Sequence, residues 1–122
     1  MVTCCLVCED QALIGMALEA YLEEQGIVVA GLFLSCAEAL AWIEGDTPQV
    51  AILDYMLQDG PCTDLAQALI GRGVPVIIYS GFSVDAETPS VLRTVTWLEK
   101  PVDRGCLMGA VAQFVPSLAL RS

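Results

Sequence analysis

Polar side chains that could do chemistry follow four of the short apolar runs in this chain. Glu9 and Asp10 come after the first run, Asp54 after the third, Ser80 after the fourth and Lys100 after the fifth. If the runs are parallel strands, these residues meet at one edge of a sheet. Three carboxylates at such an edge would repel by roughly a few kcal/mol unless they were protonated or held a cation. Because all-oxygen ligands of high charge suit Mg²⁺, which shares its sites with phosphate, the pattern predicts a magnesium site.

Each of these residues also has an ordinary structural interpretation. Asp10 could cap a helix, Ser80 before Gly81 could belong to a turn, and Lys100 could be a surface lysine. The meeting of all of them at one point favours the chemical interpretation. Lys100 is the only lysine in the chain. It could pair with Asp54 and later contact an oxygen of a bound phosphoryl group.

Two alternating patterns along the chain would position these residues. Nearly continuous apolar runs indicate strands that are covered on both faces. These runs are 4–8, 27–34, 50–53, 74–79 and 95–98. Helical spacing of apolar residues at i, i+3, i+4 and i+7 follows most of them. The helical sets are Leu13, Met16, Ala17 and Ala20; Cys36, Ala39, Leu40 and Ile43; Cys62, Leu65, Ala66 and Leu69; and Leu107, Ala110, Val111 and Phe114.

Helix boundaries agree with this alternation. Ser35 and Glu38 match a capping box, and Asp103 could cap the last helix. The expected helix ends are Gly26, Gly45, Gly73 and, for the last helix, Pro116. The fourth helix of this alternation has little room. If Thr88 is its N-cap and Pro89 its first helical residue, barely one turn remains before Arg93. We therefore expect a short or irregular fourth helix within the segment 82–94.

Charge and hydropathy exclude several classes of function. The formal net charge is −10 and no basic run exists, so neither nucleic acid nor an anionic membrane surface is an expected partner. No apolar stretch approaches the roughly 20 residues of a membrane span. No basic segment precedes an apolar run at the N-terminus, so no signal peptide is expected. We expect a cytoplasmic protein.

The histidine and cysteine content narrows the chemistry further. The chain has no histidine, which removes Ser-His-Asp and Cys-His catalysis and any histidine-ligated metal. Cys5 and Cys8 match C-x-x-C, but on a strand they would face opposite sides of the sheet. Cys4 and Cys8 would share a face about 13 Å apart. We expect the cysteines to act as small apolar side chains rather than as ligands or disulfides.

The strand-end residues and their surroundings together resemble the receiver domain of two-component response regulators, over nearly the whole chain. The matching segments are Leu6-Val7-Cys8-Glu9-Asp10, Ala51-Ile52-Leu53-Asp54-Tyr55-Met56, Val76-Ile77-Ile78-Tyr79-Ser80-Gly81 and Trp97-Leu98-Glu99-Lys100-Pro101. Each segment is a weak signal, but their order and spacing are specific. The resemblance implies an α/β, flavodoxin-like, doubly wound (βα)5 fold with a five-stranded parallel sheet in the order 2-1-3-4-5. A single domain over residues 1–122 is expected.

The resemblance also implies a role for each site residue. Asp54 would be the phosphoacceptor. Glu9 and Asp10 would hold Mg²⁺ together with Asp54 and the backbone carbonyl of Met56, with Asp10 the more direct ligand. Lys100 would bind the phosphoryl group. The donor would be a phosphohistidine on a histidine kinase or a histidine phosphotransfer protein, which agrees with the absence of an imidazole here.

Switching residues are implied in the same way. Ser80 would be the switch hydroxyl, and Trp97 holds the place of an aromatic residue that often rotates inward on activation. The bond between Lys100 and Pro101 would be cis, which X–Pro bonds tolerate. Phosphorylation would then change contacts with a downstream protein. The bulky apolar residues Phe82 and Met56 flank the site, and we expect them to restrict attacking water.

The high apolar fraction permits an exposed patch and hence a homodimer.

Three other functions match parts of the pattern. A pseudo-receiver, an interaction module of the same fold that is not phosphorylated, would typically lack an acidic, acceptor or lysine position, and all are present. A flavin carrier would need a phosphate-binding loop where Glu9 and Asp10 would repel the phosphate. A phosphatase with an aspartyl intermediate generally has a second aspartate where this chain has Met56.

Overall fold

The computed structural model describes residues 4–81 and 88–114. The five principal strands are β1 (Cys4–Cys8), β2 (Val28–Phe33), β3 (Val50–Asp54), β6 (Val76–Ser80) and β7 (Thr96–Glu99). A short hairpin follows β3 and consists of β4 (Met56–Leu57) and β5 (Gly60–Pro61). The helices are α1 (Ala12–Glu24), α2 (Cys36–Ile43), α3 (Thr63–Gly71) and α4 (Arg104–Phe114), with a 3-10 helix η1 (Ser90–Arg93). The expectations for Phe82 and Pro116 lie outside the described residues.

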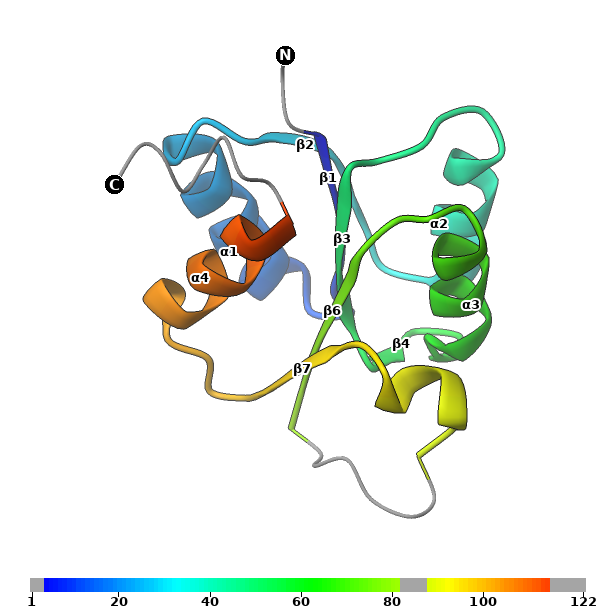
Figure 1. Ribbon diagram of the computed structural model, residues 1–122. Helices are drawn as coiled ribbons and strands as arrows, with labels where there is room; N and C mark the ends of the chain where they lie inside the picture. Colours follow the sequence, from blue (N-terminus) through cyan, green and yellow to red (C-terminus); the bar gives the residue numbers. More distant parts are fainter. Residues whose placement is uncertain (1–3, 82–87, 115–122) are drawn as a thin grey trace.

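The principal strands form one parallel sheet in the order β2-β1-β3-β6-β7 (Figure 1). In terms of successive principal strands this is the predicted order 2-1-3-4-5, so the flavodoxin-like prediction is confirmed. The chain passes from each principal strand to the next through a helical segment, as a parallel sheet requires. All carboxyl ends of the strands therefore lie at one edge, which is the edge that carries the polar residues.

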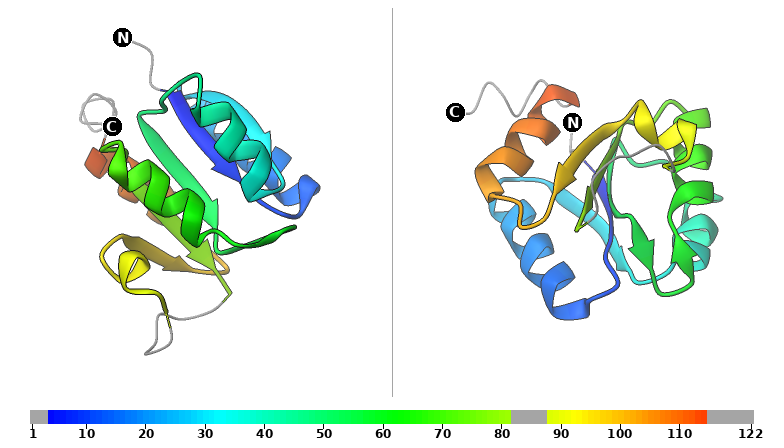
Figure 2. Two further views of the ribbon diagram at one scale, coloured as in Figure 1. Left: turned by 90° about the vertical axis from the view of Figure 1, so that its right-hand side faces the viewer. Right: turned by 90° about the horizontal axis from the view of Figure 1, so that it is seen from below.

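Two helical layers cover the sheet, and the view from below in Figure 2 separates them. Side chains of β1 alternate between the layers, because Leu6 and Cys8 pack in the core with α2 and α3, while Cys5 and Val7 pack with α1 and α4. We call these two sides the α2/α3 face and the α1/α4 face. Strands β1, β3 and β6 are buried almost throughout, as predicted. Strands β2 and β7 are half-buried, because each lies at an edge of the sheet.

Helix α1 presents a different side to the core from the one predicted. The expected stripe of Leu13, Met16, Ala17 and Ala20 faces solvent, with Leu13 82% and Met16 56% exposed. The buried residues of the helix are Gly15 and Leu22. A Cβ at Gly15 would lie 2.5 Å from Cδ1 of Leu32, so α1 approaches β2 through its glycine. Because α1 is apolar on several sides, the spacing of its apolar residues does not decide which side is buried.

The other helix boundaries largely follow the sequence. Ser35 is the N-cap of α2, and its hydroxyl accepts a hydrogen bond from the backbone N–H of Glu38 at 3.2 Å. The Glu38 carboxylate accepts from the N–H of Leu34 rather than from that of Ser35. Gly26 and Gly73 have positive φ after α1 and α3, which ends these helices without steric cost. The N-cap of α1 is Gln11, so Asp10 does not cap that helix.

The expectation of a short fourth helix is confirmed within the described residues. Pro89 is the N-cap of η1, which ends at Arg93 after a single short 3-10 segment. The buried Leu92 anchors it to the α2/α3 face. No helix of the described residues is long and apolar enough to cross a membrane. The six cysteines all lie in the described part of the chain, and all are free thiols.

Candidate functional site

The site lies where one row of residues crosses the carboxyl edge of the sheet. Asp54 at the end of β3 is in register with Tyr79 of β6, and Tyr79 is in register with Leu98 of β7. Cys8 pairs with Leu53, so Glu9 continues this row beside Asp54. Because side chains alternate along a strand, the row continues the α1/α4 face of Val7, Ile52 and Ile77. The sheet therefore brings together side chains that are up to 91 positions apart in the sequence.

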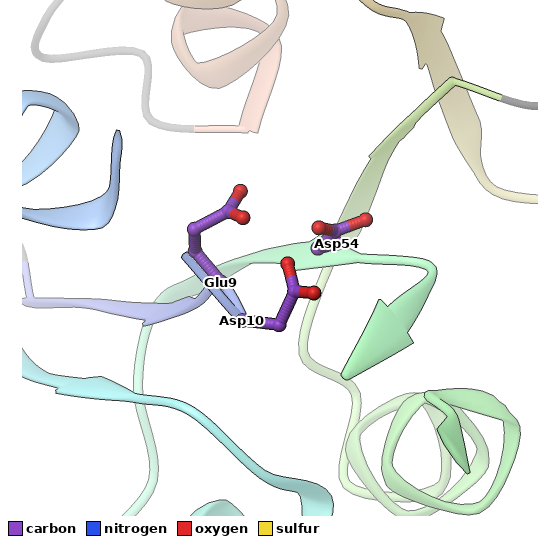
Figure 3. Close-up of side chains that lie close together, drawn as sticks. All are labelled: Glu9, Asp10 and Asp54. Carbon is purple, nitrogen blue, oxygen red and sulfur yellow. The ribbon is translucent and has the colours of Figure 1, made fainter. Parts of the chain in front are cut away.

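Three carboxylates gather at this edge, as the strand-end pattern predicted. Glu9, Asp10 and Asp54 each offer an oxygen, and these oxygens lie within 4.8 Å of one another. Figure 3 shows the three carboxylates around a common space, with Glu9 and Asp10 coming from the end of β1 and Asp54 from β3. Glu9 is fully buried and Asp54 is 6% exposed, so little water screens the repulsion between their charges.

Glu9 is held by three donors. Its Oε1 accepts a hydrogen bond from the backbone N–H of Gln11 at 3.0 Å. Its Oε2 accepts from the hydroxyl of Tyr79 and from Nζ of Lys100, the latter at 3.3 Å. A buried carboxylate needs such partners, because an unpaired one would cost several kcal/mol, by order of magnitude. Glu9 is consequently oriented by its neighbours before any cation arrives.

Lys100 is the counter-charge of the cluster. Its Nζ lies 3.0 Å from Oδ2 of Asp54 and 3.3 Å from Oε2 of Glu9, and its side chain is 28% exposed. The backbone N–H of Lys100 donates to the carbonyl of Ser80 at 2.7 Å, which fixes the start of the loop after β7. The Lys100–Pro101 peptide bond is cis, as the resemblance implied. The predicted pairing of Lys100 with Asp54 is thus observed.

The titration of the site reflects burial and mutual charge. Burial raises the pKa of Asp54 to about 6, and the negative charge of Glu9 adds to this, while the hydrogen bond and positive charge of Lys100 act in the opposite direction. A hydrogen bond with Glu9 is the largest cause that holds the pKa of Asp10 below its usual range. Burial alone would lower the pKa of Lys100, but Asp54 and Glu9 outweigh burial and raise it.

The predicted switch residues lie on the other side of the sheet. Trp97 is in register with Ile78 and packs on the α2/α3 face, where its ring lies 5.6 Å from that of Tyr55. Ser80 ends β6, is 1% exposed, and by strand alternation follows Ile78 onto the same face. Trp97 is therefore separated from the Tyr79 row by the sheet, whereas Ser80 is the last residue of β6 and lies at the carboxyl edge itself, next to Tyr79. Their switching roles stay predictions.

Met56 begins the hairpin that follows Asp54. Its side chain is 40% exposed, and it pairs with Pro61 across the hairpin. The hairpin is tied to α2, because the carboxylate of Asp59 accepts hydrogen bonds from the backbone N–H groups of Cys36 at 2.8 Å and Ala37 at 3.0 Å. This connection supports the backbone beside Asp54. The part of the Met56 carbonyl in metal binding stays a prediction.

The sequence interpretation missed Tyr79 and the backbone N–H of Gln11. The sequence places Tyr79 in an apolar strand and in a segment that carries the family resemblance, but gives it no role of its own, although its hydroxyl is a polar group near the end of a buried run. A buried tyrosine usually hydrogen-bonds its hydroxyl, and this was the available signal. Nothing in the sequence indicated which acceptor it would reach.

The donor set of the cluster fits Mg²⁺. It consists of carboxylate oxygens without sulfur or nitrogen, and a hard cation prefers such ligands. A cation among these oxygens would also relieve the repulsion from Glu9, which adds to the effect of burial in raising the pKa of Asp54. Both oxygens of Glu9 already accept hydrogen bonds, so Asp10 and Asp54 are better placed than Glu9 to hold the ion.

Comparisons with known proteins agree with the geometry. Residues 5–112 match the family model of the response regulator receiver domain. SdrG from Sphingomonas melonis Fr1 is 34% identical, with 93% of this chain and 97% of that chain covered and a TM-score of 0.77. The receiver domain of the PhyR response regulator of Erythrobacter litoralis is 24% identical, with 93% and 90% covered and a TM-score of 0.81.

A third solved structure shows the same fold over the full length. A CheY-like receiver domain protein from Methanospirillum hungatei JF-1 has a TM-score of 0.85 at 21% identity, with 100% of both chains covered. No curated protein matches the chain. The family model covers most of the sequence, and the strand-end residues form the acidic cluster and its lysine. The chain belongs to the family of response regulator receiver domains.

Proposed function

We propose that this receiver domain accepts a phosphoryl group on Asp54 in a Mg²⁺-dependent reaction and thereby switches its contacts with other proteins. One observation carries the proposal: the Asp54 carboxylate lies within one cluster of ligand oxygens with Glu9 and Asp10, and 3.0 Å from the ammonium of Lys100. Carboxylates supply a nucleophile and a cation site, and the lysine supplies a positive charge for the incoming phosphoryl oxygens.

The transfer is a displacement at phosphorus. An oxygen of the Asp54 carboxylate forms a bond to phosphorus, while the bond from phosphorus to the donor nitrogen breaks and leaves its electron pair on that nitrogen, which takes up a proton. Lys100 can shift from Oδ2 of Asp54 to an oxygen of the transferred group. When bound, Mg²⁺ supplies further positive charge for the phosphoryl oxygens. The aspartate must be deprotonated to attack, and a bound cation favours that form.

The donor we propose is a protein that carries a phosphohistidine, either a histidine kinase or a phosphotransfer protein. The exposed side of α1 supports this, because Leu13 and Ile14 border a pocket of about 630 Å³ that Tyr79 and Lys100 also line. An apolar helix face beside the acceptor offers a docking surface next to the reacting group. We place this exchange in the cytoplasm, where such donors would meet the domain.

The proposed output follows from the other side of the sheet. Trp97 belongs to the α2/α3 face, against which η1 packs through Leu92, and Ser80 ends β6 at the carboxyl edge between that face and the site. A phosphoryl group held by Lys100 and contacted by the Ser80 hydroxyl would bias this region between two arrangements. The downstream partner would then read the face formed by α3, η1 and β7.

Phosphorylation by a small donor tests the proposal. Intact mass spectrometry after incubation with phosphoramidate and Mg²⁺ should show an increase by one phosphoryl group. The increase should be lost on chelation of Mg²⁺ and in Asp54→Asn. Asp46→Asn, which alters an exposed aspartate, is the matched control and should keep the increase. An unchanged mass in the wild type would refute the proposal and favour an interaction module that is not phosphorylated.

A further inference from the structure

Tyr79 is a buried polar residue of the site that has no part in the proposed transfer. It is 6% exposed, and its hydroxyl donates a hydrogen bond to Oε2 of Glu9. Strand β3 lies between the strands that carry these two residues. At ordinary strand spacing, the side chains of Tyr79 and Glu9 together bridge about 10 Å of sheet. The contact therefore passes over the end of β3, the strand that carries Asp54.

The same side chain also contacts the lysine of the site. Nζ of Lys100 lies 4.7 Å from the centre of the Tyr79 ring. This is within the separation of about 6 Å at which the electron-rich face of an aromatic ring attracts a cation. Tyr79 thus contacts a carboxylate with its hydroxyl and an ammonium with its ring face.

Two donors share one oxygen of Glu9. Oε2 accepts from the Tyr79 hydroxyl and from Lys100 at 3.3 Å, while Lys100 lies closer, at 3.0 Å, to Oδ2 of Asp54. An oxygen that already accepts a hydrogen bond attracts a second donor less strongly. If the hydroxyl were removed, Oε2 would become a better partner for Lys100, which would then be drawn from Asp54 toward Glu9.

We propose that Tyr79 is a positioning residue that occupies the Glu9 carboxylate and so keeps Lys100 directed toward Asp54 and the phosphoryl group that Asp54 accepts. The phosphoryl step of this inference rests on the proposed function. The placement of Lys100 does not, because the three contacts exist in the unphosphorylated protein.

The first experiment measures phosphorylation of Tyr79→Phe, which keeps the ring and removes only the hydroxyl. At saturating Mg²⁺ and phosphoramidate, the rate should fall about threefold to tenfold, which is the scale of one hydrogen bond. The Mg²⁺ concentration for half-maximal rate should change less than the rate does. Tyr79→Leu, which removes the ring as well, should be slower still. An unchanged rate in either variant, or a rate that extra Mg²⁺ fully restores, would overturn the inference.

Tyr21→Phe is the matched control. Tyr21 also has its ring over a cation, Arg104, at 5.0 Å, and its hydroxyl donates to the Arg104 carbonyl at 3.5 Å, away from the carboxylates. The same chemical change there should leave the phosphorylation rate as in the wild type. A loss of rate in Tyr21→Phe equal to that in Tyr79→Phe would show a general effect on packing and would contradict the role assigned to Tyr79.

The second experiment needs no phosphorylation. A double-mutant cycle of Glu9→Gln and Lys100→Met in the free energy of unfolding measures how strongly these two residues interact. The coupling should be larger in the Tyr79→Phe background than in the wild-type background, because Lys100 then pairs with Glu9. Equal coupling in both backgrounds would refute the positioning role. If the wild type accepts no phosphoryl group, only the proposed function fails, and this cycle still decides the role of Tyr79.

Discussion

At the residue scale, burial makes the charge of Asp54 unfavourable before any cation is bound. The side chain lies beside Glu9 in a region with little water, and among the described residues Lys100 is the cation that pairs with both carboxylates. A site of this kind is primed to take up a cation or a proton. The charged form of Asp54 therefore lowers the stability of the metal-free fold.

The effect of Asp54→Asn on stability follows from this burial. Because the pKa of Asp54 in the folded protein is raised to about 6 from an ordinary 3.8, the folded state binds a proton more readily than the unfolded chain does. The stability that the folded state gains from this proton is fully present below the ordinary pKa, and it is lost as the pH rises through about 6. At neutral pH without metal, we expect Asp54→Asn to be more stable than the wild type by about 1–3 kcal/mol.

Urea unfolding of both proteins across the pH range, in chelator, measures this difference. It should grow between roughly pH 4 and pH 6 and then level off. Addition of Mg²⁺ should shrink it, because the wild type then gains stability from binding that the variant lacks. An Asp54→Asn protein that is less stable than the wild type at neutral pH without metal would contradict the description of the cluster.

At the scale of elements, α1 combines a structural side and an exposed apolar side. Gly15 and Leu22 hold it against the sheet, while Leu13 and Met16 face solvent beside the site. Such an exposed stripe is costly for a solitary domain unless a partner covers it. The helix is therefore the element through which we expect the phosphodonor to bind.

Leu13→Ala tests this docking role. Phosphotransfer from a protein donor should slow by about fivefold or more, as for a central interface residue, whereas phosphorylation by phosphoramidate should not change. Val28→Ala is the matched control, because Val28 is also an exposed apolar residue, at 48%, but lies on β2. Equal rates of protein phosphotransfer in Leu13→Ala and the wild type would show that donors do not use this side of α1. Light scattering would show whether a second copy covers it instead.

Helix α2 depends on a capping residue from the hairpin. Asp59 accepts hydrogen bonds from two N–H groups of the first turn, and these bonds, with that of Cys36 the largest cause, hold its pKa below the ordinary value. Asp59→Ala should therefore lower the thermal midpoint by a few degrees, more than Asp46→Ala does. Because the folded pKa is depressed, the contribution of Asp59 should be present at neutral pH and lost on acidification below its ordinary pKa. Equal midpoints for the two variants in thermal melts would refute the cap.

At the scale of the whole molecule, the fold is stabilised by two apolar cores without covalent cross-links. Free cysteines contribute to both cores: Cys8, Cys36 and Cys62 to the α2/α3 side, and Cys5 to the α1/α4 side. Burial raises the pKa of Cys36 to about 11 and that of Cys62 to about 12. These thiols act as packing groups, as the composition suggested.

Thiol accessibility checks this packing. In the native protein, Cys106 is the exposed cysteine, so a thiol reagent should modify it first, and the buried thiols should react only on unfolding. Cys106→Ser should remove the fast phase. A reducing agent should leave the midpoint of the thermal transition unchanged. Rapid modification of Cys8 or Cys62 under native conditions would show that the α2/α3 core is loosely packed.

The sequence by itself determined the alternation of strands and helices, the short fourth helix and the set of strand-end residues, because these follow from local periodicity. The order of the strands in the sheet was implied only by the family resemblance. Only the tertiary structure decided that α1 buries Gly15 rather than the stripe beginning at Leu13, since several sides of that helix are apolar. The contact of Tyr79 with Glu9 spans 70 positions and depends on sheet register. Pairing of distant side chains is set by the lateral order and rotation of packed elements, which no local pattern encodes. The strand-end residues that would carry out the chemistry could therefore be predicted from the sequence, while the role of Tyr79 in orienting them could not.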